Sequence, residues 1–183
     1  GFGSKGRLKP GRLYPETEKA LLDFYWDYVL LKNDIASARR GPWIVAGSEN
    51  HDINAKHENL LASQIFMHHP DYAERIYPDL GRMVGYGYGG GFAARVGIKS
   101  ENIKVRLGSG NYKDGKAYNA ADHYAAWVEF WKLFFAERAR HGFFIEHNAK
   151  GYMSHTGRFL HDIYAWSEDA ELRKQARMFL DLV

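Results

Sequence analysis

Apolar side chains recur at intervals of three and four residues in several stretches of this chain, and this spacing most limits what the chain can fold into. It marks one face of an α-helix. The clearest case follows Asn119, which forms a capping pair with Asp122. The pattern predicts helices at 16–36, from Ile53 to a stop at Pro70, briefly through Tyr72 and Ile76, at 119–140, at 154–166, and after a cap at Ser167.

A glycine-rich segment interrupts these helices. Residues 81–115 hold ten of the 19 glycines and show no sustained helical period, apart from a brief strand pattern at 103–107. Long connections of this kind in a compact domain usually serve a site. We therefore predict a long active-site loop at 81–118, with Tyr86, Tyr88 and Tyr112 as candidates.

Composition excludes several classes of protein. The 183 residues correspond to one domain, and 45% hydrophobic with 26% charged residues excludes a mainly disordered chain. The net charge of +3 is spread along the sequence and gives no indication of nucleic acid binding. No apolar run approaches the roughly 20 residues of a membrane span. Without cysteine there is no disulfide and no thiolate nucleophile.

The predicted architecture is all-α, with antiparallel helical hairpins that carry an elaborated loop at one end. Such hairpins are typical of bundles and of helical toroids. A closed double ring would need roughly twice this length if each hairpin takes about 40 residues. The chain also lacks an export signal and closes in mid-helix by pattern. We therefore expect residues 1–183 to form a single, partial (α/α) toroid domain of a longer protein.

Two polar clusters are candidates for chemistry. In the first, residues 47–52, a loop meets a helix, and unpaired N–H groups there could hold an anionic group together with Asn50 and His51. The alternative is that Asn50 or Asp52 is only a helix cap. The second, residues 141–148, brings a carboxylate, Glu146, next to an imidazole, His147. Its alternative is an inter-helix loop that caps the next helix.

The remaining polar and aromatic residues are weaker candidates. His57 is predicted to be packed and hydrogen-bonded, and His68, His69 and His161 to face solvent. His123 could face the same cleft as the long loop, and Trp43 could stack on a sugar or pack as part of a hinge. The tryptophans predicted to lie in the core are Trp26, Trp127, Trp131 and Trp166. Glu49, His51, Asp52, Glu146 and His147 are suitable metal ligands, but no H-E-x-x-H pair is present, and we expect no metal.

The second cluster resembles a motif of polysaccharide lyases with an α/α toroid, the chondroitin and hyaluronate lyase type. The stretch 141–147, with Tyr152 and Gly157 after it, is similar to their D-G-S-F-I-Q-H…Y-x-G-x-Y-G segment. His147 matches the catalytic histidine and Tyr152 the first tyrosine, whereas Thr156 stands where the final, catalytic tyrosine would be. The Asn50–His51 pair is similar to the Asn–His pair of alginate and heparin lyases in the toroid group. Together these resemblances cover about 35 residues.

The resemblance implies β-elimination on a uronic-acid-containing polysaccharide, with no cofactor, in a secreted or periplasmic protein. It assigns catalysis to Asn50, His51, His147 and Tyr152. The residues assigned to substrate binding are Trp43, Glu146, Tyr112, Tyr118, His123 and Arg158, with Arg95 and Arg106 as further cations. Tyr112 or Tyr118 could replace the missing catalytic tyrosine.

Two other functions remain open at the level of the sequence. A glycoside hydrolase would need two carboxylates roughly 5 to 10 Å apart, and Glu146 with Asp52 or Asp114 are the candidates. A non-catalytic carbohydrate-binding helical module is the third interpretation. We expect no nucleic acid or membrane as partner, and the oligomeric state does not follow from the sequence.

Overall fold

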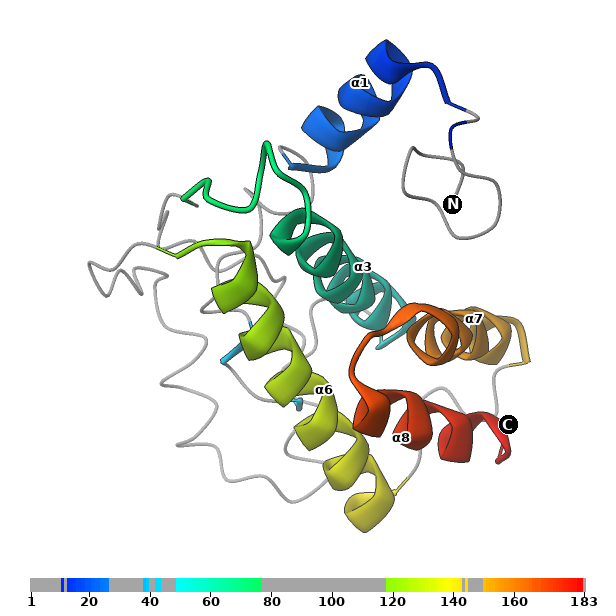
Figure 1. Ribbon diagram of the computed structural model, residues 1–183. Coiled ribbons are helices and arrows are strands. Elements are labelled where there is room, and N and C mark those ends of the chain that lie inside the picture. Colours follow the sequence, from blue (N-terminus) through cyan, green and yellow to red (C-terminus); the bar gives the residue numbers. More distant parts are fainter. Residues whose placement is uncertain are drawn as a thin grey trace, which may run out of the picture.

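The regular structure of this protein is helical, as the apolar spacing predicts. The computed structural model describes residues 11, 13–26, 38–39, 42–43, 49–76, 118–142, 144 and 150–182. Figure 1 shows the helices of these residues, which are α1 (Pro15–Tyr25), α3 (Glu49–Met67), α6 (Ala120–His141), α7 (Lys150–Trp166) and α8 (Ala170–Leu180). The all-α prediction is confirmed for the described part of the chain.

Four of these helices pack around one core, with α3 between α6 and α7, and α8 against both α6 and α7. Helices α3 and α6 are antiparallel, because Glu49 at the start of α3 contacts Arg138 near the end of α6, while Lys56 contacts Trp131. A three-residue connection, 167–169, turns the chain from α7 into α8. The chain thus forms two helical hairpins, α3 with α6 and α7 with α8, that lie against each other (Figure 1).

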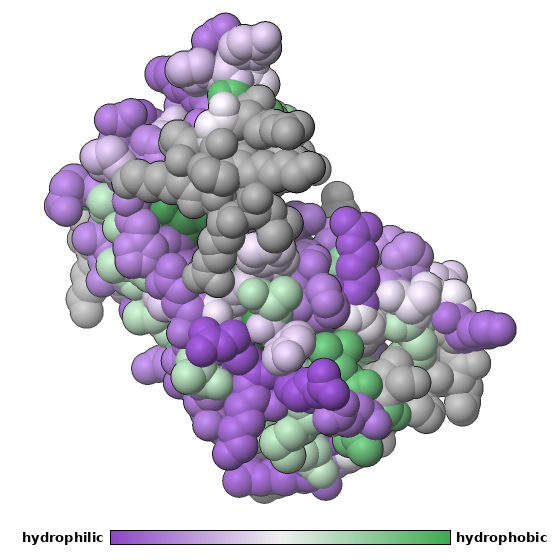
Figure 2. Space-filling model, turned by 45° about the vertical axis from the view of Figure 1, so that its right-hand side comes forward, coloured by the Kyte–Doolittle hydropathy of each residue, from purple (hydrophilic) through white to green (hydrophobic). Residues whose placement is uncertain are grey.

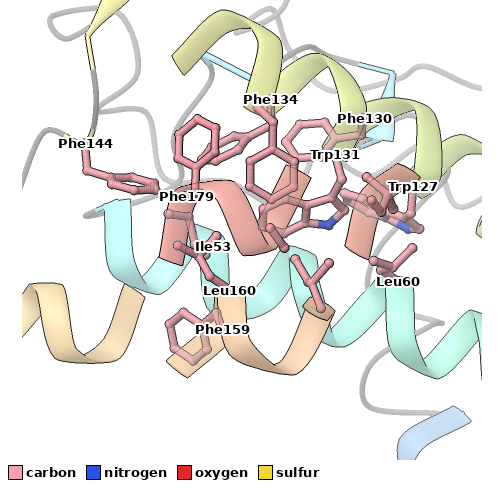
Figure 3. Packing of buried hydrophobic residues seen from close by; sticks show 14 of the residues in the cluster. Ile53, Leu60, Trp127, Phe130, Trp131, Phe134, Phe144, Phe159, Leu160 and Phe179 are labelled. Atoms are coloured by element: carbon pink, nitrogen blue, oxygen red, sulfur yellow. The ribbon is translucent and has the colours of Figure 1, made fainter. Parts of the chain in front are cut away.

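Half of the buried residues in the main core are aromatic, and most of these aromatic residues come from α6. Trp127, Trp131, Phe134 and Phe135 follow each other at helical spacing and are almost fully buried. In Figure 3 the rings of Trp127, Trp131 and Phe134 point from α6 toward the labelled residues of α3, α7 and α8. Phe135 belongs to the same buried cluster. Large aromatic groups bury the most area per residue, so this face of α6 is the main source of hydrophobic stabilisation. Trp26 is buried as predicted, whereas Trp166 is only partly buried.

Helix α1 lies at the edge of the molecule and is held by its C-terminal end (Figure 1). Trp26 packs against Phe66 and Tyr72 in a second, smaller cluster. The Tyr72 hydroxyl donates a hydrogen bond to Asp23 of α1. The apolar side chains of Leu21 and Phe24, which the sequence pattern assigns to the inner face of a helix, are exposed instead.

Helix ends differ from the prediction in three places. Helix α7 begins at Lys150 rather than at 154, and α8 is capped by Asp169, whose side chain accepts from the Leu172 N–H, rather than by Ser167. Residues 68–74 form successive turns and no further helix through Tyr72. The predicted cap of α6 is confirmed, since Asn119 and Asp122 form a reciprocal capping box. For 16–36, the helix is confirmed as far as Tyr25, and residues 27–37 lie outside the described part.

Candidate functional site

Residues 49–52 of the first candidate cluster form the first turn of α3, which begins at Glu49, and residues 47 and 48 lie outside the described part. Asn50 and His51 are consecutive, and consecutive residues of a helix point about 100° apart. The two side chains therefore face different sides of the helix. Asn50 is buried, with 6% of its surface exposed, while His51 faces solvent. Asp52 is buried and bound to Lys56 at 2.5 Å. The turn thus offers one inward amide and one outward imidazole.

A buried ion pair underlies this turn. Nη2 of Arg138 donates to the Glu49 carboxylate at 2.8 Å, and both side chains are about 1% exposed. The guanidinium lies between two rings, 4.0 Å from the centroid of Trp43 and 4.6 Å from that of Phe134. Burial lowers the pKa of Arg138, and the Glu49 carboxylate opposes that shift. The Nε and Nη1 groups of Arg138 have no hydrogen-bond partner.

Trp43 is part of this packing. Its indole N–H donates to Glu137 at 2.9 Å, its ring meets that of His141 at 6.1 Å, and it is buried against α6. Arg138 covers one face of the indole. Of the two interpretations of Trp43 that the sequence left open, these contacts correspond to packing.

Tyr152 lies in the first turn of α7 and is half exposed. Helices α3 and α7 run parallel, and two contacts define their register. The His57 ring stacks on Phe159 at 4.7 Å, and the Gln64 amide donates to the carbonyl of Trp166 at 2.9 Å. In both contacts the α7 residue number exceeds the α3 residue number by 102. Continued toward the N-termini, this register aligns Asn50 with Tyr152.

Thr156 follows Tyr152 by about one helical turn and faces the core. It is fully buried, and its hydroxyl has no hydrogen-bond partner. The position that matches the final tyrosine of the lyase motif therefore points into the core and away from solvent.

Two further candidates lie together at the other end of α6. Arg39 donates to the hydroxyl of Tyr118 at 3.1 Å, and the Tyr118 and His123 rings are 6.5 Å apart. Burial lowers the pKa of His123 from its ordinary value of 6.5 to about 4, so this imidazole is neutral at pH 7. His123 precedes Arg138 by 15 residues, which is about 22 Å along a helix. The structure thus separates Tyr118 and His123 from the first turn of α3.

Arg158 is exposed on α7 and belongs neither to the first turn of α3 nor to the pair of Tyr118 and His123. Burial lowers the pKa of His57 and raises that of Glu58, and the positive charge of Arg158 lowers both. Arg158 therefore lies beside the middle of α3. The other candidates fall outside the described residues, and these are Glu146, His147, Tyr112, Tyr86, Tyr88, Arg95, Arg106, Asp114 and nearly all of the loop 81–118.

The ion pair between Arg138 and Glu49 was not predicted from the sequence. The signal was present, because Arg138 continues the apolar stripe of Trp131, Phe134 and Phe135 at helical spacing. A cation on a buried stripe requires an acidic partner. Spacing alone did not show that the partner lies 89 residues away.

Within the described residues, no three His, Asp or Glu side chains are grouped as metal ligands. None of the described helices combines the length and apolarity of a membrane crossing, and the face in Figure 2 is mostly hydrophilic. Comparison with models of protein families, with curated proteins and with solved structures finds no match.

Proposed function

We propose that the end of the molecule formed by the first turns of α3 and α7 binds a uronic-acid-containing polysaccharide and cleaves it by β-elimination. One observation carries the proposal, namely the parallel register that aligns Asn50 and His51 with Tyr152. Two hairpins in contact, with one helix of each running parallel, are also the arrangement of neighbouring hairpins in an (α/α) toroid. The partial toroid remains part of this proposal.

The site has the groups that such a reaction needs. The reaction removes the proton at C5, forms a C4–C5 double bond and breaks the bond from C4 to the glycosidic oxygen, which takes up a proton. Both helices direct their positive N-terminal ends toward this region, which favours the substrate carboxylate and the charge that develops on it. Of the Asn50–His51 pair, the exposed His51 is assigned to that carboxylate, while Asn50 is buried in the same turn. Tyr152 is assigned to proton transfer. His147, outside the described residues, stays a candidate for the same step.

The experiment is to incubate the protein with alginate, glucuronan, chondroitin and heparin, and to record both the ultraviolet absorbance of unsaturated uronate and new reducing ends. We expect both signals to rise together on at least one of these substrates. Tyr152→Phe removes only a hydroxyl from an exposed residue, and we expect it to lower the rate by about 100-fold or more. Tyr164→Phe, on the same helix and also exposed, is the matched control and keeps the rate.

His51→Gln tests the other half of the site in the same assay. We expect a loss of comparable size, whereas His161→Gln, at an exposed position of α7, retains the activity. Reducing ends without absorbance would instead indicate hydrolysis. The geometry gives hydrolysis less support, because the one described candidate carboxylate, Asp52, is buried in its pair with Lys56.

A non-catalytic carbohydrate-binding module is the second candidate function, and Thr156 is the observation that favours it. The inward, buried position of Thr156 supplies no phenol where the lyase motif has its catalytic tyrosine. Binding of a saccharide without turnover of any of the four substrates, with the same affinity in Tyr152→Phe, would identify this function.

A further inference from the structure

The buried pair between Arg138 and Glu49 joins two helix ends that are distant in sequence. Glu49 is the first residue of α3, and Arg138 lies in the last turn of α6. Asn50 follows Glu49 directly. Any rotation of this first turn relative to α6 must therefore stretch or break the 2.8 Å contact between Nη2 and the carboxylate.

Stability alone is a poor explanation for this pair. Removing two charges from water is expensive, and the attraction between them offsets that only when the remaining donors also find partners. Here Nε and Nη1 of Arg138 remain without hydrogen bonds. An apolar pair of similar volume would fill the same space without this penalty. Compared with an apolar pair, the ion pair adds a hydrogen bond, which forms only in a particular orientation of the two side chains.

The surroundings of Arg138 fix that direction. Trp43 and Phe134 lie over the guanidinium, so its N–H groups can point only within a narrow plane. Trp43 is held in turn, because its indole N–H donates to Glu137, the neighbour of Arg138 on α6. Glu137 thus orients Trp43, and Trp43 with Phe134 orients Arg138. Arg138 in turn contacts the Glu49 carboxylate.

We propose that Arg138, acting through Glu49, is a positioning residue that sets the orientation of the first turn of α3 and thereby of Asn50 and His51. The role in catalysis rests on the proposed function above, whereas the orientation of the turn does not. Arg138 need not touch the substrate.

The experiment compares three forms of the full chain. The apolar double variant Glu49→Leu with Arg138→Met replaces the pair, Glu49→Gln keeps the acceptor but removes its charge, and His68→Gln with Glu168→Gln removes an exposed ion pair at the other end of α3 as a matched control. Each form is measured for its thermal midpoint, for the nuclear magnetic resonance signals of the Asn50 side-chain amide and the His51 ring, and for kcat and KM.

We expect the apolar double variant to unfold within a few degrees of the parent, since such replacements are often neutral. Its Asn50 and His51 signals should nevertheless shift or broaden, and kcat should fall by about tenfold or more with little change in KM. Glu49→Gln leaves the buried charge of Arg138 without an acidic partner, so its thermal midpoint should fall, but it should keep the parent signals because it still accepts from Arg138. The control should keep both signals and kcat. This result would support positioning.

Parent-like signals and kcat in the apolar double variant would overturn the proposal. If that variant does not fold, Arg138→Lys decides instead. It keeps the charge but loses the planar guanidinium between the rings, so unchanged signals there would equally overturn it. If the parent cleaves no acidic polysaccharide, the proposed function fails, while the signals of Asn50 and His51 still decide whether the pair positions the turn.

Discussion

Two buried polar residues show how a single side chain affects this fold. Thr156 is fully buried with an unpaired hydroxyl, and His123 is buried as a neutral imidazole. Helical spacing shows that a residue faces inward, but it does not show whether the buried group is hydrogen-bonded or charged. The unpaired hydroxyl of Thr156 and the neutral imidazole of His123 therefore could not be predicted. His57 was predicted to be packed and hydrogen-bonded, and this is confirmed, since its Nδ1 lies 2.6 Å from the Asn54 carbonyl oxygen.

Thr156→Val should stabilise the protein. Valine keeps the shape of threonine and removes a buried hydroxyl that has no partner, so we expect the free energy of unfolding to rise by about 1 kcal/mol. Urea denaturation at pH 7 measures the change. Thr156→Ala, which also removes a buried methyl group, should destabilise instead. An unchanged or lower stability of Thr156→Val would show that the hydroxyl is satisfied in solution.

His123 should make stability depend on pH in a defined range. Its pKa in the folded protein, about 4, lies below the ordinary 6.5, so the unfolded chain binds the proton more readily. The stabilisation is complete above pH 6.5 and is lost as the pH falls toward 4, by about 3 kcal/mol. The pKa of His57 is also lowered, and it contributes in the same direction.

Denaturation at pH 7 and at pH 4 tests this with two variants. His123→Gln should lose about 3 kcal/mol less than the parent between these two values. His161→Gln, at an exposed position, should lose as much as the parent. Equal losses in the parent and both variants would mean that His123 takes up its proton without unfolding.

At the scale of the elements, periodicity predicted the existence of the helices better than their ends. The apolar stripe of α6 and its capping box are both local signals, and both are confirmed. The start of α8 was placed at Ser167 because its hydroxyl is a common cap, but the turn of the chain presents Asp169 to the Leu172 N–H instead. Which of two nearby capping residues acts depends on the preceding helix, and spacing does not contain that information.

Gln64 connects α3 to the turn between α7 and α8. Its amide N–H donates to the Trp166 carbonyl at 2.9 Å, and its carbonyl accepts from the Glu168 N–H at 2.8 Å. Gln64→Leu leaves both backbone groups without these partners, and we expect it to lower the free energy of unfolding by about 2 to 4 kcal/mol. Ile65→Gln, at the adjacent exposed position, should change it by less than about 0.5 kcal/mol. Chemical denaturation distinguishes them, and similar values for both would contradict this role of Gln64.

At the scale of the whole molecule, the arrangement of the hairpins decides which candidates can act together. The contacts that align α3 with α7 join residues about a hundred positions apart, so no local pattern could predict them. The structure places Asn50, His51 and Tyr152 at the end where α3 and α7 begin, and Tyr118 with His123 near the start of α6. We also expect the first cluster and the turn with Glu146 and His147 to face one groove, and this stays a prediction because that turn lies outside the described residues.

The measurement that tests this arrangement most directly is the distance between the first turns of α3 and α7. Because the chain contains no cysteine, spin labels can be attached at two introduced cysteines alone, His51→Cys with Tyr152→Cys, and compared with His51→Cys with Tyr164→Cys. Tyr164 lies twelve residues further along α7, about 18 Å along the helix. We predict a label distance that is shorter by roughly 10 Å in the first pair. An equal or longer distance in the first pair would contradict the parallel register and, with it, the proposed site.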